Sequence, residues 1–290
     1  TTICPSESVT ISVATTSQAT YTFYVGGTQQ QESSSATFTT TGISRTSSVV
    51  ITITNASGCS ETVSTVINVV DLEDGGSITP TNSTICMGGD SPSISNLVSA
   101  TLEDYSSAAS ITYFWEQSFD TVSWTTVAGT ESSLAAAAVT GIVTTTYFRR
   151  GAEVVNGDSD SCEILYTIPI TVNVEASITP TISSSTGAFT FCVGDSPTFE
   201  SQTIPAGVVT YTWSYFNGTS TVTSTGTGTT TEVTIVANGY IQLDILTAAG
   251  CEYTTRENIT LADAINTALT APTTICPSES VTISVATTSQ

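Results

Sequence analysis

The chain contains no lysine and no histidine, and its only basic side chains are four arginines. Against these stand 25 acidic residues, which give the 290-residue chain a formal net charge of −21. Such a chain has no basic patch to neutralise phosphates, so we expect neither nucleic acid nor an anionic membrane surface as a partner. Histidine and lysine supply most general bases and imine-forming amines, so their absence predicts that the protein is not an enzyme.

Long apolar runs and strong helix formers are also scarce. No stretch of 18 or more apolar residues occurs, so we expect no direct membrane insertion. No signal peptide opens the sequence, and we expect a mature protein or a piece of a longer one. Methionine occurs once and lysine never, whereas threonine, serine, valine and isoleucine are abundant, which favours strands over helices.

One segment of 18 residues occurs twice without a change. TTICPSESVTISVATTSQ occupies residues 1–18 and again residues 273–290. Identity over 18 residues is not a chance event, so the chain is predicted to be one full period of a tandem array plus the opening of the next copy. If the identical ends had been introduced by design, they would still imply that the parent sequence repeats.

Within the period, a looser pattern predicts three modules. Each has an early cysteine followed by small or acidic residues and a late cysteine downstream, and the five residues Ser-Ile-Thr-Pro-Thr recur at 77–81 and 177–181. A proline in an extended threonine-rich stretch makes a stiff linker. The predicted parts are module 1 at 1–76, module 2 at 77–176, module 3 at 177–272, and the start of the next copy at 273–290.

Each module shows the period-two alternation of half-buried strands. Val9, Ile11 and Val13 alternate with polar residues, and Gly26-Gly27 offers the positive φ angles of a tight hairpin. Five to seven short strands in each module, separated by turn residues, predict an all-β fold of tandem β-sandwiches.

The cysteines are expected to form disulfides. The chain has no C-x-x-C motif and no histidine to complete a zinc site. Six cysteines allow fifteen pairings, of which the module boundaries favour one bond inside each module. The expected pairs are Cys4–Cys59, Cys86–Cys162 and Cys192–Cys251, with Cys276 bonded to the next repeat. Disulfides require an oxidising compartment outside the cytoplasm.

Aromatic residues follow each early cysteine at similar spacing. Phe23, Trp115 and Trp213 each lie in a strand of the form Tyr-x-aromatic, and we expect them to be core residues packed against the module's disulfide, as in immunoglobulin-like sandwiches. A ligand-stacking platform is the alternative. Trp124 has no counterpart in the other modules, and core packing and an exposed surface contact both remain open for it.

Two acidic clusters are weak candidates for calcium. Hard oxygen ligands suit Ca²⁺, but neither cluster matches a known calcium loop, and a solvated acidic loop is the alternative that we favour. We therefore expect no cofactor unless calcium is bound. The candidate ligands are Asp158, Asp160 and Glu163 in one cluster, and Asp71 and Asp74, with Glu73 between them, in the other.

The motifs together resemble a known family. The run Cys192-Val193-Gly194-Asp195-Ser196-Pro197, a Thr-Tyr-x-Trp strand, and Thr-Tyr-Phe-Arg-Arg before the late cysteine of module 2 resemble the immunoglobulin-like or PKD-like repeats of giant Bacteroidota surface proteins, of the SprB-like gliding-motility adhesin type. Module 1 departs from the pattern, with Phe23 in place of tryptophan. The resemblance implies export by the type IX secretion system, contact with the gliding machinery, and O-glycosylation of Thr121 in Asp120-Thr121-Val122.

The expected function is therefore mechanical reach and adhesion by a disulfide-stapled filament at the cell surface. Its expected partners are neighbouring repeats of the same chain and abiotic or polysaccharide surfaces. A passive stalk carrying a distal adhesin is one alternative. A carbohydrate-binding array, with Trp124 as its contact residue, is another, and a carboxylate-only glycoside hydrolase is the most remote.

Overall fold

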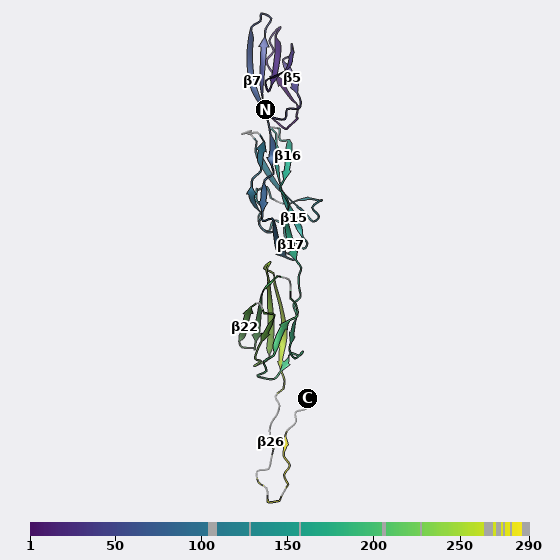
Figure 1. Ribbon diagram of the computed structural model, residues 1–290, viewed down its shortest axis with the longest axis vertical. Coiled ribbons are helices and arrows are strands. Elements are labelled where there is room, and N and C mark those ends of the chain that lie inside the picture. Colours follow the sequence, from purple (N-terminus) through teal and green to yellow (C-terminus); the bar gives the residue numbers. More distant parts are fainter. Residues whose placement is uncertain are drawn as a thin grey trace. The chain divides into compact units, whose positions relative to one another are not determined.

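The computed structural model describes residues 1–103, 109–127, 129–156, 158–204, 207–226, 228–263, 269–270, 274, 276–278 and 280–285. The chain divides into two compact units, Thr1–Glu175 and Ala176–Gln290. All regular structure among the described residues is strand, which confirms the all-β expectation (Figure 1).

The first sandwich occupies the N-terminal part of the first unit. Its larger sheet has the order β1-β7-β6-β3-β4, and a two-stranded ladder of β2 and β5 covers it. All its pairs are antiparallel except β1 with β7. The strand bounds are β1 Thr2–Ile3, β2 Val9–Ser12, β3 Thr20–Val25, β4 Thr28–Ser33, β5 Thr37–Thr40, β6 Ser47–Thr54 and β7 Ser60–Val69.

The second sandwich follows directly and completes the first unit. Its main sheet has the order β10-β17-β15-β13-β14, with β16 also paired to β15, and the ladders β11-β9 and β12-β8 accompany it. The strand bounds are β8 Asp71–Asp74, β9 Ser77–Thr79, β10 Asn82–Cys86, β11 Ser95–Val98, β12 Thr101–Glu103, β13 Ile111–Ser118, β14 Thr125–Val127, β15 Thr146–Val155, β16 Ser161–Tyr166 and β17 Ile170–Glu175.

The third sandwich lies in the second unit. Its sheets have the orders β19-β25-β24-β21-β22 and β18-β20-β23, and a separate ladder pairs β26 with β27. The strand bounds are β18 Ile182–Ser184, β19 Thr190–Phe191, β20 Thr198–Ser201, β21 Val208–Phe216, β22 Thr221–Gly226, β23 Thr230–Glu232, β24 Gly239–Thr247, β25 Glu252–Leu261, β26 Leu269–Thr270 and β27 Ser284–Val285.

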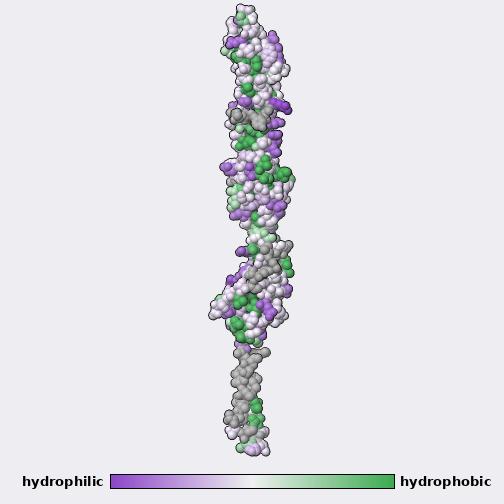
Figure 2. All heavy atoms as spheres, turned by 60° about the vertical axis from the view of Figure 1, so that its left-hand side comes forward, coloured by the Kyte–Doolittle hydropathy of each residue, from purple (hydrophilic) through white to green (hydrophobic). Residues whose placement is uncertain are grey.

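Each sandwich has an apolar core built by alternate inward side chains. Phe23, Trp115 and Trp213 are buried in the first, second and third cores, as the sequence predicts. Gly26 and Gly27 join β3 to β4 with φ angles of 57° and 80°, the conformation expected of that hairpin. On the face shown in Figure 2, hydrophobic residues lie in small separate patches among white and purple ones.

Candidate functional site: the junction of the first two sandwiches

A tight turn closes the first sandwich at the end where the chain leaves it. Strand β1 pairs in parallel with the last residues of β7, so Cys4 lies beside the end of β7. The backbone N–H of Cys4 donates to the Glu7 carboxylate at 2.8 Å, and the N–H of Glu7 donates to the Cys4 carbonyl. Ser6, which lies between Cys4 and Glu7, has a φ of 65°. Figure 1 shows the N-terminus at the end of this sandwich next to β16.

A hairpin of the second sandwich meets this turn. Between β15 and β16, the side-chain oxygen of Asn156 accepts the backbone N–H groups of Asp158 and Asp160, both at 2.9 Å. The N–H of Asn156 donates to the Asp160 carbonyl. Asparagine forms such turns because its side chain satisfies backbone donors two to four residues on. The hairpin tip is thereby held in one shape.

A disulfide joins the turn to the hairpin. Cys4 bonds to Cys162 with a Cα–Cα distance of 4.9 Å, across 158 residues of sequence. The Asn156 side-chain amide donates to Glu7 at 3.2 Å beside the bond. The Cys4 N–H, and then the Asn156 amide, hold the pKa of Glu7 below its ordinary value, because both bonds favour the carboxylate. The junction is therefore covalent and hydrogen-bonded at once.

The expected Cys4–Cys59 bond is wrong, and the reason is the length of one strand. Cys59 precedes the first residue of β7, whereas Cys4 lies beside its last. Ten strand residues span roughly 33 Å at about 3.3 Å each. A disulfide needs Cα atoms within about 7 Å. The two cysteines of the first sandwich therefore lie at opposite ends of it.

The other two expected pairs are also wrong. Cys86 lies in register with Glu175 at the end of β17, and Cys162 is bonded to Cys4. In the third sandwich, β19 pairs with the last two residues of β25, so Cys192 lies at the end of β25 and Cys251 before its start. Cys192 is an exposed free thiol. The core aromatics consequently have no disulfide inside their own sandwich of the kind expected.

Apolar packing closes the junction beneath the disulfide. Val70, the single residue between β7 and β8, is 1% exposed and donates its N–H to the Ile3 carbonyl. It belongs to a small core with Leu72, Ala152 and Val154, against which Cys162 packs. A buried, hydrogen-bonded connection restricts hinge motion of the backbone at this point.

Two of the candidate calcium ligands do come together here. Asp71 and Glu163 share a hydrogen bond that raises the pKa of Glu163, and burial raises it further. The Leu72 N–H donates to the Glu163 carboxylate at 3.0 Å. Asp74 instead accepts the Gly76 N–H in its own turn. Within the described ranges, no group of three or more acidic, cysteine or histidine side chains could hold a metal ion.

Arg150 fastens the segment after the junction, and the sequence did not single it out. Its side chain is fully buried among the inward positions of β15. Its guanidinium donates to the carbonyls of Gly75, Val98 and Ser132. Burial lowers the pKa of Arg150, and the Tyr113 ring lies 4.5 Å from the charge. The signal was its alternation in step with Phe148, which places an arginine on the core face.

The neighbouring arginine builds a stack on the outer face of β15. The Arg149 guanidinium carbon lies 4.1 Å from the Trp124 ring centre and 3.7 Å from that of Tyr166. Glu116 pairs with the same guanidinium at 2.7 Å. Trp124 is therefore half-buried against a cation, which corresponds to neither of the two sequence alternatives.

Thr121 lies in the exposed loop between β13 and β14. It has a φ of 62°, and its hydroxyl donates to the Asp120 carbonyl. Asp120 accepts the N–H groups of Ser123 and Val122, which lower its pKa to about 2. The loop is held in a fixed shape while Thr121 remains accessible, so O-glycosylation at Thr121 stays a prediction.

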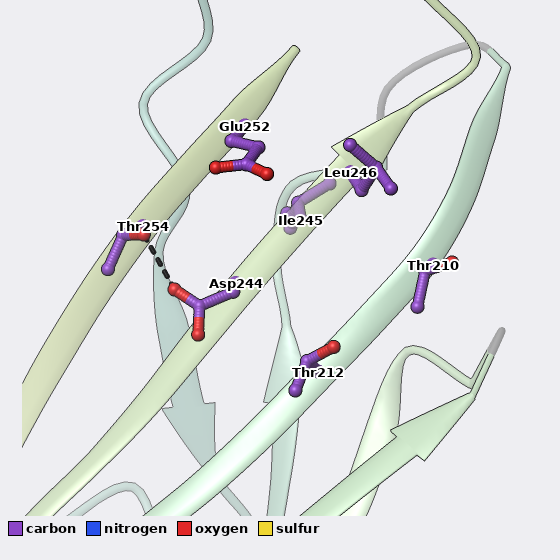
Figure 3. A pocket seen from close by; sticks show the side chains of 7 residues that line it. All are labelled: Thr210, Thr212, Asp244, Ile245, Leu246, Glu252 and Thr254. Atoms are coloured by element: carbon purple, nitrogen blue, oxygen red, sulfur yellow. Dashed lines mark hydrogen bonds between the residues drawn. The ribbon is translucent and has the colours of Figure 1, made fainter. Parts of the chain in front are cut away.

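A shallow groove lies on the third sandwich. Side chains of β21, β24 and β25 line a space of about 330 Å³, with Asp244 and Glu252 on its walls (Figure 3). Thr254 donates to Asp244 at 2.6 Å, and Gln242 donates to it as well. No aromatic ring is among the lining residues, so this groove offers no stacking platform for a sugar.

These features define a protein of tandem immunoglobulin-like sandwiches, the first two of which are joined by a disulfide. Residues 74–176 match a family model described as a domain of unknown function, DUF8696. No curated protein matches the chain. No helix able to cross a membrane occurs in the part of the chain that the structure describes.

Solved structures of similar architecture are distant. A crystal structure of consecutive titin domains is 13% identical, with 90% of this chain and 96% of that one covered at a TM-score of 0.37. Sidekick-1 immunoglobulin domains 1–5 are 13% identical, with a TM-score of 0.29. The match covers 90% of this chain but only 57% of that fragment. The Clostridium thermocellum CbhA fibronectin(III)-like modules are 12% identical, with a TM-score of 0.29, and the match covers 66% of this chain and 92% of that one.

Proposed function

We propose that the chain is one structural repeat of a long extracellular filament that adheres to surfaces. The observation that carries this proposal is the Cys4–Cys162 bond, which ties one sandwich to the next rather than closing a sandwich on itself. A bond between successive domains restricts their relative position. It is what an array whose function depends on shape would need.

The chemistry of the chain supports a place outside the cytoplasm. The disulfide requires an oxidising compartment. A net charge of −21, with the remaining surface rich in serine and threonine, keeps neighbouring filaments apart by repulsion. That repulsion also protects the exposed strand edges of a β-rich array from pairing with one another.

Adhesion would come from many weak contacts. Phe119, Val122 and Ile168 are 66%, 80% and 87% exposed on the second sandwich, so each copy presents apolar side chains to a surface. Repetition multiplies such contacts into avidity. By the resemblance to SprB-like adhesins, the surfaces are abiotic or polysaccharide, and the filament is exported by the type IX system and moved by the gliding machinery.

Electron microscopy of the native surface fraction tests this proposal. Three sandwiches stacked end to end in a filament would give an axial repeat on the order of 100 Å, from strands of several residues at about 3.3 Å each plus loops. Fibres of that period, which become irregular after reduction, are the expected result. Compact particles without a period would overturn the filament, and fibres that bind neither glass nor polysaccharide would leave only a passive stalk.

A carbohydrate-binding array is the second candidate, favoured by one groove. Tyr113, Phe114, Glu131 and Glu153 line a space of about 620 Å³ on the second sandwich, which combines aromatic rings with carboxylates. Binding of the chain to a polysaccharide panel, compared with Phe114→Ser and Trp124→Ala variants, tests it. Unchanged binding in both variants would exclude these aromatic residues as the contact.

A further inference from the structure

The turn that holds Cys4 occurs in all three sandwiches. The second residue after each early cysteine has a positive φ, and its N–H donates to the carbonyl of an isoleucine distant in sequence. These residues are Ser6, Gly88 and Gly194, with φ angles of 65°, 77° and 92°, and the acceptors are Ile43, Ile142 and Ile235. Each sandwich therefore ends on the same cysteine-bearing turn.

The turn of Cys192 reproduces that of Cys4 bond for bond. The Cys192 N–H donates to the Asp195 carboxylate at 2.8 Å, as the Cys4 N–H does to Glu7. The Asp195 N–H donates to the Cys192 carbonyl at 3.2 Å, again as Glu7 does to Cys4. Cys192 is an exposed free thiol, so one half of a Cys4–Cys162 junction is present without its other half.

The missing half lies at the far end of the first sandwich. In the β6–β7 hairpin, the Cys59 N–H donates to the Asn55 side chain, and the Asn55 N–H donates to the Cys59 carbonyl, both at 3.0 Å. Asn156 and Asp160 make the same two bonds beside Cys162. When Asn55 is aligned with Asn156, Cys59 takes the place of Asp160, two residues before Cys162. Side chains two residues apart on a strand point to the same face of the sheet. The Cys59 thiol is exposed and free.

We propose that Cys192 forms a disulfide with the cysteine equivalent to Cys59 in the following copy of the repeat. The copy begins at residue 273, where the sequence of residues 1–18 resumes. The side-chain amide equivalent to Asn55 would then donate to Asp195, as Asn156 donates to Glu7. This inference rests on the proposed repeat array and continues the staple of the first junction from copy to copy.

The bond forms by oxidation of two thiols. Both S–H bonds break and one S–S bond forms, and two electrons and two protons pass to a disulfide oxidant, which is reduced to two thiols. In the test that oxidant is oxidised glutathione. The Cys59 and Cys192 thiols of a single chain have no partner of this kind at hand and stay reduced.

A chain with residues 1–272 twice in tandem tests the proposal against the 290-residue chain. Both are refolded with oxidised and reduced glutathione, alkylated without reduction, digested and analysed by mass spectrometry. In the single chain, Cys59 and Cys192 are expected to be alkylated completely. In the tandem chain, half of each is expected to be protected and recovered as one linked peptide pair.

Matched variants identify the bond. Cys59→Ser in the second copy is expected to restore full alkylation of Cys192, whereas Cys59→Ser in the first copy leaves the link intact. Full alkylation of both sites in the tandem chain, or a link found only in covalent dimers, would overturn the proposal. The disulfide between Cys192 and the next Cys59 does not depend on adhesion. Native fibres that lack this disulfide would overturn this inference alone. The disulfide in the tandem chain, without fibres in the native surface fraction, would overturn only the proposed filament.

Discussion

At the residue scale, neighbouring charged side chains differ sharply in burial and in the direction of their pKa shifts. Arg149 and Arg150 are adjacent in β15, yet one stacks on the outer face and the other lies fully buried. Glu7 and Glu163 flank the same disulfide, yet their pKa values shift in opposite directions. These two pairs give matched comparisons within the first unit.

Replacing the buried arginine is expected to destabilise the first unit strongly. Arg150→Met removes four hydrogen bonds from a charged donor, three to the carbonyls of Gly75, Val98 and Ser132 and one to the Asn96 side chain, each worth about 1.5–3 kcal/mol. Part of this loss is offset because the charge no longer has to be buried, so we expect the free energy of unfolding of the first unit to fall by about 4 kcal/mol in urea titrations. Arg149→Met, which loses a surface ion pair and a stacked cation, is the control and should cost about 1 kcal/mol. Equal losses would contradict the structure.

Replacing Glu163 is expected to change how stability depends on pH. Its raised pKa means that the folded state binds more protons than the unfolded state above the ordinary value of 4.5, so stability falls as pH rises through this window. Glu163→Gln should abolish that fall and raise the melting temperature at pH 7.

Glu7 provides the comparison of opposite sign. Its lowered pKa gives stability that is present above 4.5 and lost as pH falls below it. Glu7→Gln should therefore lower the melting temperature at neutral pH and leave it unchanged in acid. Melting curves recorded between pH 3 and pH 7 check both variants, and shifts of the same sign in the two would refute the assignment.

At the element scale, the junction depends on where strands end. The period-two pattern, the Gly26-Gly27 hairpin and the buried positions of Phe23, Trp115 and Trp213 all follow from local sequence and were predictable. The pairing of the cysteines was not. It requires knowing that β1 runs parallel to β7, which places Cys4 at the end of the sandwich opposite to Cys59. Parallel pairing is a long-range contact, and spacing within the sequence carries no trace of it.

Loss of the staple is expected to uncouple the first two sandwiches. Cys4→Ser removes a closure of 158 residues, worth up to about 5 kcal/mol on the chain-entropy model. Calorimetry should then resolve two transitions for the first unit, where we expect a single one in the parent. Cys59→Ser is the control, because Cys59 is a free, exposed thiol, and it should leave the single transition intact. A single transition in the Cys4→Ser variant would show that the small apolar core around Val70 is enough to couple the first two sandwiches.

At the scale of the whole molecule, charge controls association. The chain carries 25 acidic residues against four basic ones, and its isoelectric point is near 4.1. As pH falls toward that value the repulsion between chains disappears, and we expect light scattering to rise steeply. Added salt at pH 7 should raise it less, because screening weakens the repulsion without removing the charges. Unchanged scattering at pH 4 would show that charge does not keep the chains apart.

The same staple sets how far the chain can be stretched. When the two ends are pulled, tension crosses from Cys4 to Cys162 through the sulfur atoms and bypasses the residues between them. Unfolding that stretch would otherwise release a contour of roughly 550 Å, at about 3.5 Å per residue. The residues between Cys4 and Cys162 are thus spared from the load, and this part of the chain cannot lengthen until the disulfide is reduced.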